Sequence, residues 1–309
     1  MRIIVTGGAG FVGSWVCGAY ISEGHDVLVI DNLSTGSVNN IPAKADFQEL
    51  DIMDRSGLSK AFMKFRPDYV NHHAGQINVR FSVSDPSFDA GTNIIGSVNI
   101  MEMCREMKVK KLVFSSTGGA IYGEPEKIPA DENTIPSPLS PYGTSKLCVE
   151  NYLELYRRLH GLDFIALRYS NVYGERQNPG GESGVISIFC NNIMNNQTCI
   201  VYGDGNQTRD YVYCKDVAEA NIKALSAVSG IYNLGTGTEI SLNDLIGRLK
   251  IITGKRFEVM YENEREGDVR HISLDNRKAA EKLGWTPSTD FQIGLTQTWR
   301  WFSENKSSV

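Results

Sequence analysis

The chain has 309 residues, of which 41% are hydrophobic and 22% charged, a balance typical of a soluble globular protein and unlike a disordered or fibrous one. Its formal net charge is −5, and it carries no basic run, which argues against binding to nucleic acid or to an anionic membrane surface. The uncharged stretch 3–22 contains too many glycines for a membrane-spanning helix. The six cysteines form neither a C-x-x-C pair nor a zinc-like Cys/His spacing, so we expect reduced thiols, no metal site and a cytoplasmic protein.

Strands and helices are expected to alternate along the first half of the chain. Short apolar, β-branched runs predict strands at residues 2–6, 26–30, 46–50, 68–72, 111–116 and 164–169. Helices are predicted from the glycine-rich turn to residue 23, over 55–65, from about 86 to 107, and over 142–160. Strands that are apolar on both faces and alternate with helices indicate an α/β fold with a doubly wound parallel sheet of the Rossmann type.

The glycine-rich turn follows the first strand and opens the first helix. Its sequence, T-G-G-A-G-F-V-G, places Gly7, Gly10 and Gly13 where the chain must turn tightly, approach a pyrophosphate and pack helix against strand. The helix N-terminus then offers free N–H groups and a favourable dipole to phosphates. Asp31 ends the second strand, where a carboxylate accepts hydrogen bonds from ribose hydroxyls and repels a 2′-phosphate. These two features predict NAD, rather than NADP, as the cofactor.

The residues after Asp31 extend this predicted cofactor site. Asn32 and the run Ser34, Thr35 and Gly36 complete the expected ribose pocket, and Asp51 follows the third strand beside the expected adenine position. We therefore predict an NAD-binding domain over residues 1–169, with a segment near 206–237 returning to it. A smaller α/β substrate-binding domain is expected mainly over 170–309, where the pattern is less regular and helices are predicted near 216–227, 242–253, 277–283 and 291–305.

A second motif, Y-G-T-S-K, begins the helix predicted over 142–160. Tyr142 and Lys146 are one helical turn apart and share a face. A lysine ammonium favours a neighbouring phenolate and lowers its pKa from ~10, so that the tyrosine can accept a proton from a substrate hydroxyl while hydride leaves the same carbon. The fifth strand ends in S-S-T, and ligands of open parallel sheets bind at such carboxyl ends. Thr117 is our choice for a hydroxyl that bonds the reacting oxygen, with Ser116 second.

Taken together, these motifs resemble those of the extended short-chain dehydrogenase/reductase family, and within it the UDP-glucose (UDP-galactose) 4-epimerases, from about Met1 to Ser303. Further matching stretches are D-N-L-S-T-G, S-S-T-G-G-A-I-Y-G-E, L-R-Y-S-N-V-Y-G-E-R-Q, G-D-G-N-Q-T-R-D-Y-V-Y and R-E-G-D-V-R. The resemblance implies interconversion of UDP-glucose and UDP-galactose through a 4-keto sugar, with catalysis by Thr117, Tyr142 and Lys146. It also implies a homodimer in which the helices predicted near 86–107 and 142–160 pair across a two-fold axis.

The resemblance also assigns ligand contacts. The cofactor contacts that it implies, together with those given above, are Gly7, Gly10, Phe11, Val12, Gly13, Asp31, Asn32, Asp51, Ile52, Ala74, Gly75, Asn93, Ser115, Tyr142, Lys146 and Tyr169. The substrate contacts that it implies are Thr117, Asn171, Tyr202, Arg209, Arg265 and Arg270. The arginines would hold the diphosphate bidentately, and Arg270 is equally well explained as a surface ion pair.

One residue departs from the pattern of the family, and a pair of glycines separates the alternative functions. His73 stands where the family usually has an aliphatic or aromatic residue, next to the predicted cofactor site. Gly118 and Gly119 stand where 4,6-dehydratases have Asp-Glu and where uronate decarboxylases carry a glutamate, and glycine cannot donate a proton to a leaving group. Both of those activities are therefore second to the epimerase. A catalytically inactive NAD-binding regulator should lack the tyrosine or the lysine, and this chain has both.

Overall fold

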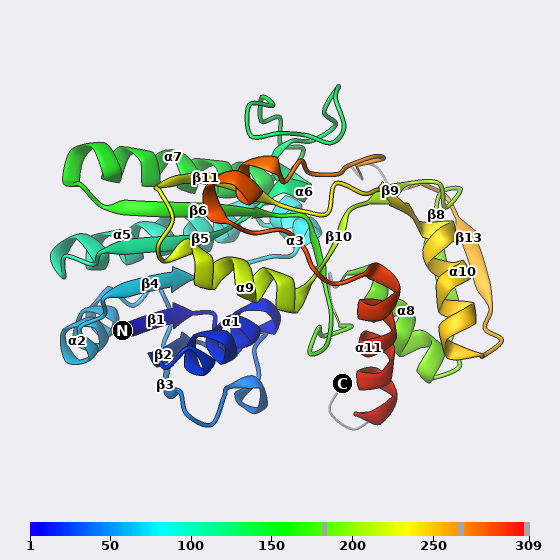
Figure 1. The fold of residues 1–309 in the computed structure, drawn as a ribbon, viewed down its shortest axis with the longest axis horizontal. Coiled ribbons are helices and arrows are strands. Elements are labelled where there is room, and N and C mark those ends of the chain that lie inside the picture. The colour runs from blue at the N-terminus through cyan, green and yellow to red at the C-terminus, as the bar shows by residue number, and fades with distance from the viewer. Residues whose placement is uncertain (181–183, 265–268, 306–309) are drawn as a thin grey trace.

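A seven-stranded parallel sheet forms the centre of the larger part of the molecule (Figure 1). The structure, a computed structural model, describes residues 1–180, 184–264 and 269–305. The strand order is β11-β6-β5-β4-β1-β2-β3, and every neighbouring pair is parallel. The strands are β1 (Arg2–Thr6), β2 (Asp26–Asp31), β3 (Asp46–Glu49), β4 (Tyr69–His72), β5 (Lys111–Thr117), β6 (Asp163–Tyr169) and β11 (Gly230–Leu234).

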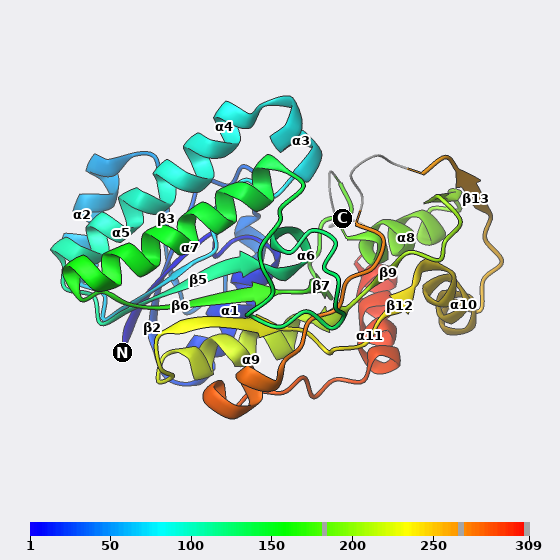
Figure 2. The same ribbon diagram turned by 90° about the horizontal axis from the view of Figure 1, so that it is seen from above.

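Helices cover both faces of this sheet. Figure 2 shows α5 (Gly96–Glu106) and α7 (Pro141–His160) side by side on one face, with α2 (Arg55–Phe65) beyond them. The opposite face carries α1 (Phe11–Ser22) and α9 (Cys214–Ala224). The predicted doubly wound parallel sheet is therefore confirmed. The strand order reverses between β1 and β4, and such a switch point at the carboxyl ends of the strands is where open α/β sheets bind ligands.

Successive residues of a strand pack into two separate apolar cores, one on each face of the sheet. Ile3 and Val5 face α1 and pack with Tyr20, whereas Ile4 points to the other face and packs with Phe62. All of these side chains are fully buried, which is why these strands read as continuous apolar runs in the sequence. Because the sheet is anchored on both faces, its carboxyl edge is a rigid platform for a site.

The long helix expected from about residue 86 to 107 is present in three consecutive parts. They are α4 (Pro86–Ala90), a π-helical turn (Gly91–Ile95) and α5. Asp85 caps the start by accepting a hydrogen bond from the Phe88 N–H at 2.9 Å. A short helix, α3 (Val79–Ser84), precedes this unit and was not predicted.

The remaining part of the chain packs around a third apolar core beyond the carboxyl edge of the sheet (Figures 1 and 2). Its helices are α8 (Val185–Met194), α10 (Leu242–Thr253) and α11 (Phe291–Glu304). Short strand pairs join them: β7 (Asn171–Tyr173) with β10 (Tyr211–Tyr213), β8 (Cys199–Tyr202) with β13 (Val259–Glu262), and β9 (Thr208–Arg209) with β12 (Ile240–Ser241). The helices α10 and α11 were predicted, whereas α8 and these short strands were not.

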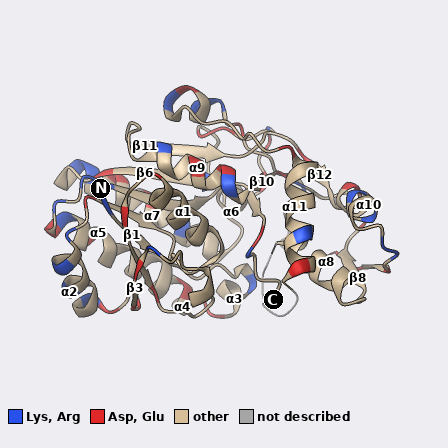
Figure 3. Cartoon of the chain, turned by 60° about the horizontal axis from the view of Figure 1, so that its bottom comes forward, with Lys and Arg blue, Asp and Glu red and all other residues tan. Residues whose placement is uncertain are grey.

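Charged residues of both signs are interspersed in the part of the structure that Figure 3 shows. Both signs occur on the helices in the view of Figure 3, and neither gathers into one block there. Within the described ranges, no helix is long and apolar enough to cross a membrane. Over the same residues, His, Cys, Asp and Glu form no group of three or more that could hold a metal ion.

Candidate active site

The glycine-rich turn has the close backbone contacts that its sequence predicts. Gly7 adopts a left-handed φ of +70°, and a Cβ there would lie 2.5 Å from the Ala74 nitrogen. A Cβ at Gly13 would lie 2.2 Å from the Gly7 oxygen, so the first turn of α1 sits directly on the loop. Gly10 is the N-cap of α1, and no side chain caps this end. The first N–H groups of α1 are thus left for a ligand, and a pyrophosphate is the anion that such a turn accepts.

Asp31 lies at the end of β2, directly beside this turn. Its Oδ2 accepts a hydrogen bond from the Ala9 N–H at 3.0 Å, and its Oδ1 accepts one from the Leu33 N–H at 2.8 Å. Each oxygen therefore keeps a lone pair free for a ribose hydroxyl. The Asn32 amide donates to the Asp51 Oδ2 at 2.8 Å, so the structure brings these two predicted residues together. The residues present on this side fit the adenosine half of a dinucleotide.

Ala74, Gly75 and Asn93 form the other side of the predicted cofactor site. The Asn93 amide grips the backbone of Gln76, accepting from its N–H and donating to its carbonyl, both at 2.9 Å. A Cβ on Gly75 would lie 2.7 Å from the Asn93 Oδ1 and 3.7 Å from the Lys146 Nζ. Glycine is therefore required where this loop passes the Asn93 side chain, and the loop lies next to Lys146.

Thr117, Tyr142 and Lys146 meet at the carboxyl end of β5. Ser140 caps α7 by accepting from the Gly143 N–H at 3.2 Å, and Pro141 is its first residue, which places Tyr142 in the first turn of the helix. The Lys146 Nζ donates to the Ser115 carbonyl at 2.9 Å and lies 5.9 Å from the centre of the Tyr142 ring. The Thr117 hydroxyl hydrogen-bonds the Tyr142 phenol. The predicted trio is thus assembled.

Burial sets the charge state of this pair in the ligand-free chain. Burial, with Asp89 nearby, raises the pKa of Tyr142 to about 12, and the hydrogen bond from Thr117 opposes that rise. Burial lowers the pKa of Lys146 to about 8, against the attraction of Asp89 and Glu150. The expected lowering of the tyrosine pKa is therefore wrong for this state, because desolvation disfavours the charged form of both side chains.

Ser116, our second choice for the reacting hydroxyl, faces the protein interior instead. Its Oγ donates to the Glu150 Oε1 at 2.6 Å, and both residues are buried. Glu150 in turn forms a two-pronged ion pair with Arg168, through Nε at 2.9 Å and Nη2 at 2.6 Å. This hydroxyl is thus committed to a structural contact, and Thr117 is left as the hydroxyl at the site.

One buried carboxylate beside the site escaped the sequence predictions. Asp89, on α4, is fully buried and accepts a hydrogen bond from the Ser145 hydroxyl at 2.6 Å. The available signal was the spacing of Asp89, Asn93 and Ser97, which are polar residues one helical turn apart and are all buried.

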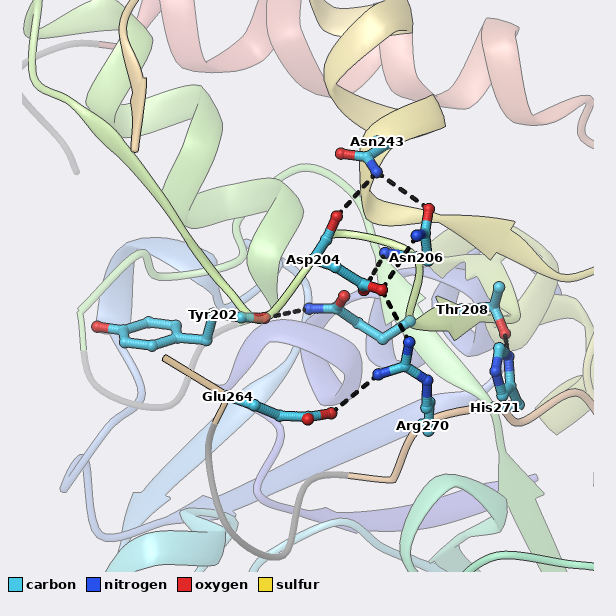
Figure 4. A network of polar contacts seen from close by, with 9 residues as sticks. Tyr202, Asp204, Asn206, Thr208, Asn243, Glu264, Arg270 and His271 are labelled. Carbon is cyan, nitrogen blue, oxygen red and sulfur yellow. Dashed lines mark hydrogen bonds and ion pairs between the residues drawn. The ribbon is translucent and has the colours of Figure 1, made fainter. Parts of the chain in front are cut away.

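Among the predicted substrate residues, Tyr202 lies on β8 and Arg209 on β9, and the backbone of Arg270 pairs with that of Thr208 on β9. Arg270 donates to the Asp204 Oδ2 at 2.9 Å and to the Glu264 Oε1 at 3.0 Å, so it forms the surface ion pairs that we gave as its alternative role (Figure 4). The Tyr202 carbonyl accepts from the Gln207 amide at 2.6 Å, and the tyrosine ring extends away from the Arg270 guanidinium (Figure 4).

The structure describes two further predicted substrate residues, Arg209 and Asn171. Arg209 donates to the Thr208 carbonyl at 2.8 Å, so its partner in this hydrogen bond is a neutral backbone oxygen and not a carboxylate. A Cβ at Gly119 would lie 3.7 Å from the Asn171 Oδ1 and 4.0 Å from the Thr117 Oγ1. The absence of a side chain at this glycine therefore leaves space between two polar atoms of the site. Arg265 lies outside the described residues.

His73, the departure noted above, points to the face of the sheet that carries α1 and α9. Its ring stacks on that of Tyr169 with centroids 6.2 Å apart, and burial lowers its pKa to about 3. Its Nε2 is buried without a hydrogen-bond partner among the described residues. The imidazole is therefore neutral and fills the place of an apolar side chain.

A glycine-rich strand–turn–helix, an aspartate at the end of the second strand and a Tyr-Lys pair at the edge of one parallel sheet are the features of a short-chain dehydrogenase/reductase. The chain matches the NAD dependent epimerase/dehydratase family over residues 3–235 and belongs to that family. The prediction of NAD as the cofactor is thereby confirmed.

Individual relatives extend over the whole chain. A putative UDP-glucose 4-epimerase of Methanocaldococcus jannaschii is 50% identical over 303 residues, which is 98% of this chain and 99% of the relative. The crystal structure of UDP-glucose 4-epimerase from Thermotoga maritima with UDP-glucose has 46% identity and a TM-score of 0.97, covering 99% of this chain and 100% of that one. The Thermus thermophilus UDP-glucose 4-epimerase complex with NAD has 42% identity and a TM-score of 0.95, with 100% of both chains covered.

Proposed function

We propose that this protein is an NAD-dependent UDP-glucose 4-epimerase that interconverts UDP-glucose and UDP-galactose through a transient 4-keto sugar. The observation that carries the proposal is the Thr117, Tyr142 and Lys146 trio at the sheet edge, beside the glycine-rich turn. The relatives of matching length and fold support the same activity.

Each side chain of the trio has a separate task in this reaction. NAD, when bound, supplies the chemistry of accepting and returning a hydride. Tyr142 takes the proton of the sugar C4 hydroxyl, and Thr117 bonds both the phenol and the reacting oxygen. The hydrogen bond of Lys146 to the Ser115 carbonyl holds its ammonium in the site, and the positive charge stabilises the phenolate that forms. After the keto sugar has turned over, the same tyrosine returns the proton.

The substrate is held by its nucleotide diphosphate while the hexose turns. We assign the diphosphate to Arg209 and Arg265, with Arg270 assisting, because guanidinium groups match phosphate oxygens in two-pronged geometry. Asn171 lies beside the sugar position next to Thr117, and Tyr202 packs on the uracil. A grip at the nucleotide end leaves the sugar ring free to present either face to the hydride.

The glycines after Thr117 favour epimerisation over dehydration or decarboxylation. A side chain at Gly118 would require fully buried Leu274 to move, because a Cβ there lies 2.4 Å from its Cδ1. Gly119 faces the space between Thr117 and Asn171 and supplies no proton donor there. The keto intermediate therefore lacks the acid at this position that would expel a C6 hydroxyl.

We further propose a cytoplasmic homodimer that serves galactose metabolism. Exposed apolar side chains gather on α3 to α5 and on α7, namely Phe81, Val83, Phe88, Ile95, Tyr152, Leu155 and Leu159. A two-fold pairing of these helices would bury them. Light scattering at micromolar concentration tests this: the mass of two chains is expected, and the mass of one chain overturns it.

The division into domains also remains our proposal. It assigns residues 1–169, with the returning segment near 206–237, to cofactor binding, and mainly 170–309 to substrate binding. The position of β11 beside β6, and the packing of α9 near α1, support the returning segment.

Product analysis tests the activity. Purified protein with NAD is incubated separately with UDP-galactose, UDP-glucose and UDP-N-acetylglucosamine, and the products are resolved by NMR. We expect UDP-galactose and UDP-glucose to interconvert, and the third incubation defines the range of sugars. No UDP-glucose from UDP-galactose, together with a 4-keto-6-deoxy sugar from a nucleotide-glucose, would replace the epimerase by a dehydratase.

A further inference from the structure

A buried carboxylate that forms no ion pair with a described residue lies behind the catalytic pair. Asp89 is fully buried and accepts three hydrogen bonds from neutral donors. They come from the Ser145 hydroxyl at 2.6 Å and from the side-chain amides of Gln76 and Asn93, both at 2.9 Å. Among the described residues, Asp89 takes part in no ion pair. Burying a negative charge costs free energy, and a nearby positive charge reduces that cost.

The three donors connect two parts of the proposed site. Ser145 lies on α7 between Tyr142 and Lys146, so its hydrogen bond to Asp89 holds the start of the catalytic helix. Asn93 and Gln76 belong to the contacts that hold the loop after β4, where a Cβ on Gly75 would lie 3.7 Å from the Lys146 Nζ. One carboxylate therefore ties the catalytic helix to the predicted cofactor loop.

We propose that Asp89 is a positioning residue of the active site, which fixes α7 through Ser145 and provides the counter-charge that keeps the buried Lys146 protonated. The inference rests on the proposed function in that it gives Lys146 a catalytic task. Asp89 itself touches neither Tyr142 nor Lys146 in a hydrogen bond, so it acts through its neighbours and through its charge.

The charges around Lys146 single out Asp89 for this task. Burial lowers the pKa of Lys146 to about 8, and Asp89 and Glu150 both oppose that shift. Glu150 is neutralised by its ion pair with Arg168. The charge of Lys146 also acts on His72 and His73, but burial and Lys146 lower their pKa values to about 3, so they are neutral near pH 8. Tyr142, with a pKa raised to about 12, is neutral there too.

The sign of the expected change follows directly. A nearby negative charge favours the ammonium form of lysine, so removing that charge lowers the pKa of Lys146 still further below 8. Asp89→Asn removes the charge at nearly constant size. Asp216→Asn is the matched control, because Asp216 is also buried and accepts from neutral donors, the Ser288 hydroxyl and the N–H and hydroxyl of Thr289.

The primary test is an NMR titration that requires no turnover. The ¹³Cε signal of Lys146 is followed against pH in lysine-labelled protein as purified, with Lys146→Met giving the assignment. We expect the midpoint to fall by about half a pH unit or more in Asp89→Asn and to stay at the wild-type value in Asp216→Asn. An unchanged midpoint in Asp89→Asn, or an equal fall in both variants, would overturn the counter-charge role.

Ser145→Ala tests the positioning role while leaving the carboxylate charged, and it serves also if Asp89→Asn does not fold. We expect kcat with UDP-galactose to fall several-fold, with KM and the Lys146 midpoint unchanged. A wild-type kcat in this variant would overturn the positioning role. Because the titration is independent of the sugar, its failure is distinct from a failure of the epimerase assignment, which would appear as inactivity of the wild-type protein.

Discussion

The two ends of the proposed site are built differently. At the catalytic end, Tyr142 and Lys146 are carried by a 20-residue helix, which Ser145 ties to the buried Asp89 and Lys146 ties to the Ser115 carbonyl. At the nucleotide end, Arg209 lies on a strand of two residues, and Arg270 is paired with exposed carboxylates. The groups of the catalytic trio are thus in place without a ligand, whereas Arg270 holds exposed ion-pair partners that a diphosphate would replace under the proposed function.

The largest expected effect is loss of the base at the catalytic end. Tyr142→Phe removes the hydroxyl that takes the sugar proton, so kcat for UDP-galactose should fall by about 10²–10⁴. Tyr156→Phe removes a hydroxyl from the same helix, one that donates to Glu102, and should retain turnover. Steady-state kinetics on both variants check this, with UDP binding measured separately and expected to persist in each. Equal activity of the two variants would contradict the role of Tyr142.

The next largest effect concerns the ion pair beneath the catalytic trio. The Glu150 and Arg168 side chains are only 2% and 4% exposed, and breaking such a pair leaves an uncompensated buried charge. Arg168→Met should therefore lower the free energy of unfolding by about 3–5 kcal/mol, measured in urea. Arg157→Met breaks an exposed pair with Glu154 on α7 and should change it little. Similar losses in both variants would show that burial of the pair is unimportant.

Between the two ends lies the predicted ribose contact. Asp31→Ala removes a charged hydrogen-bond acceptor and should weaken NAD binding by about tenfold or more, while reducing the bias against NADP. Asp26→Ala, at the exposed start of the same strand, is the control and should bind NAD normally. Calorimetry with both dinucleotides provides the measurement. Unaltered NAD affinity in Asp31→Ala would refute the contact.

The smallest effect is expected at the exposed pairs of the nucleotide end. Arg270→Ala loses a cation that is already shared with Asp204 and Glu264, so KM for UDP-galactose should change by less than about threefold. Arg209→Ala should raise KM by more. The Arg209 guanidinium donates to the Thr208 carbonyl and not to a carboxylate in its shortest contact, so its charge is available to a diphosphate. The reverse order would assign the diphosphate to Arg270.

Local sequence signals predicted the catalytic end better than the groups behind it. The Gly7, Gly10 and Gly13 turn and the Tyr142–Lys146 spacing lie within single short segments, so their geometry follows from one strand–turn–helix or one helical turn. The ion pair between Glu150 and Arg168 joins two elements, and its geometry exists only after α7 packs on β6. Their contact therefore has no signal in the linear pattern.

The predicted and the unpredicted elements of the fold differ in the length and regularity of their apolar patterns. Strands such as β1 and β5 were predicted because burial on both faces gives them continuous apolar runs. The strands β9 and β12 have two residues each and lie far apart in the chain, too short for any periodic pattern. The helix α8 follows a stretch rich in glycine and asparagine, which hid its apolar face.

Transfer of the C4 hydrogen tests the epimerase account most directly. UDP-galactose carrying deuterium at C4 is incubated with the protein and NAD in ordinary water, and the product is examined by NMR and mass spectrometry. The account predicts UDP-glucose that retains deuterium at C4, because the hydrogen leaves and returns within one closed site. Product with solvent hydrogen at C4, or with the label moved to C6 of a deoxy sugar, would contradict it.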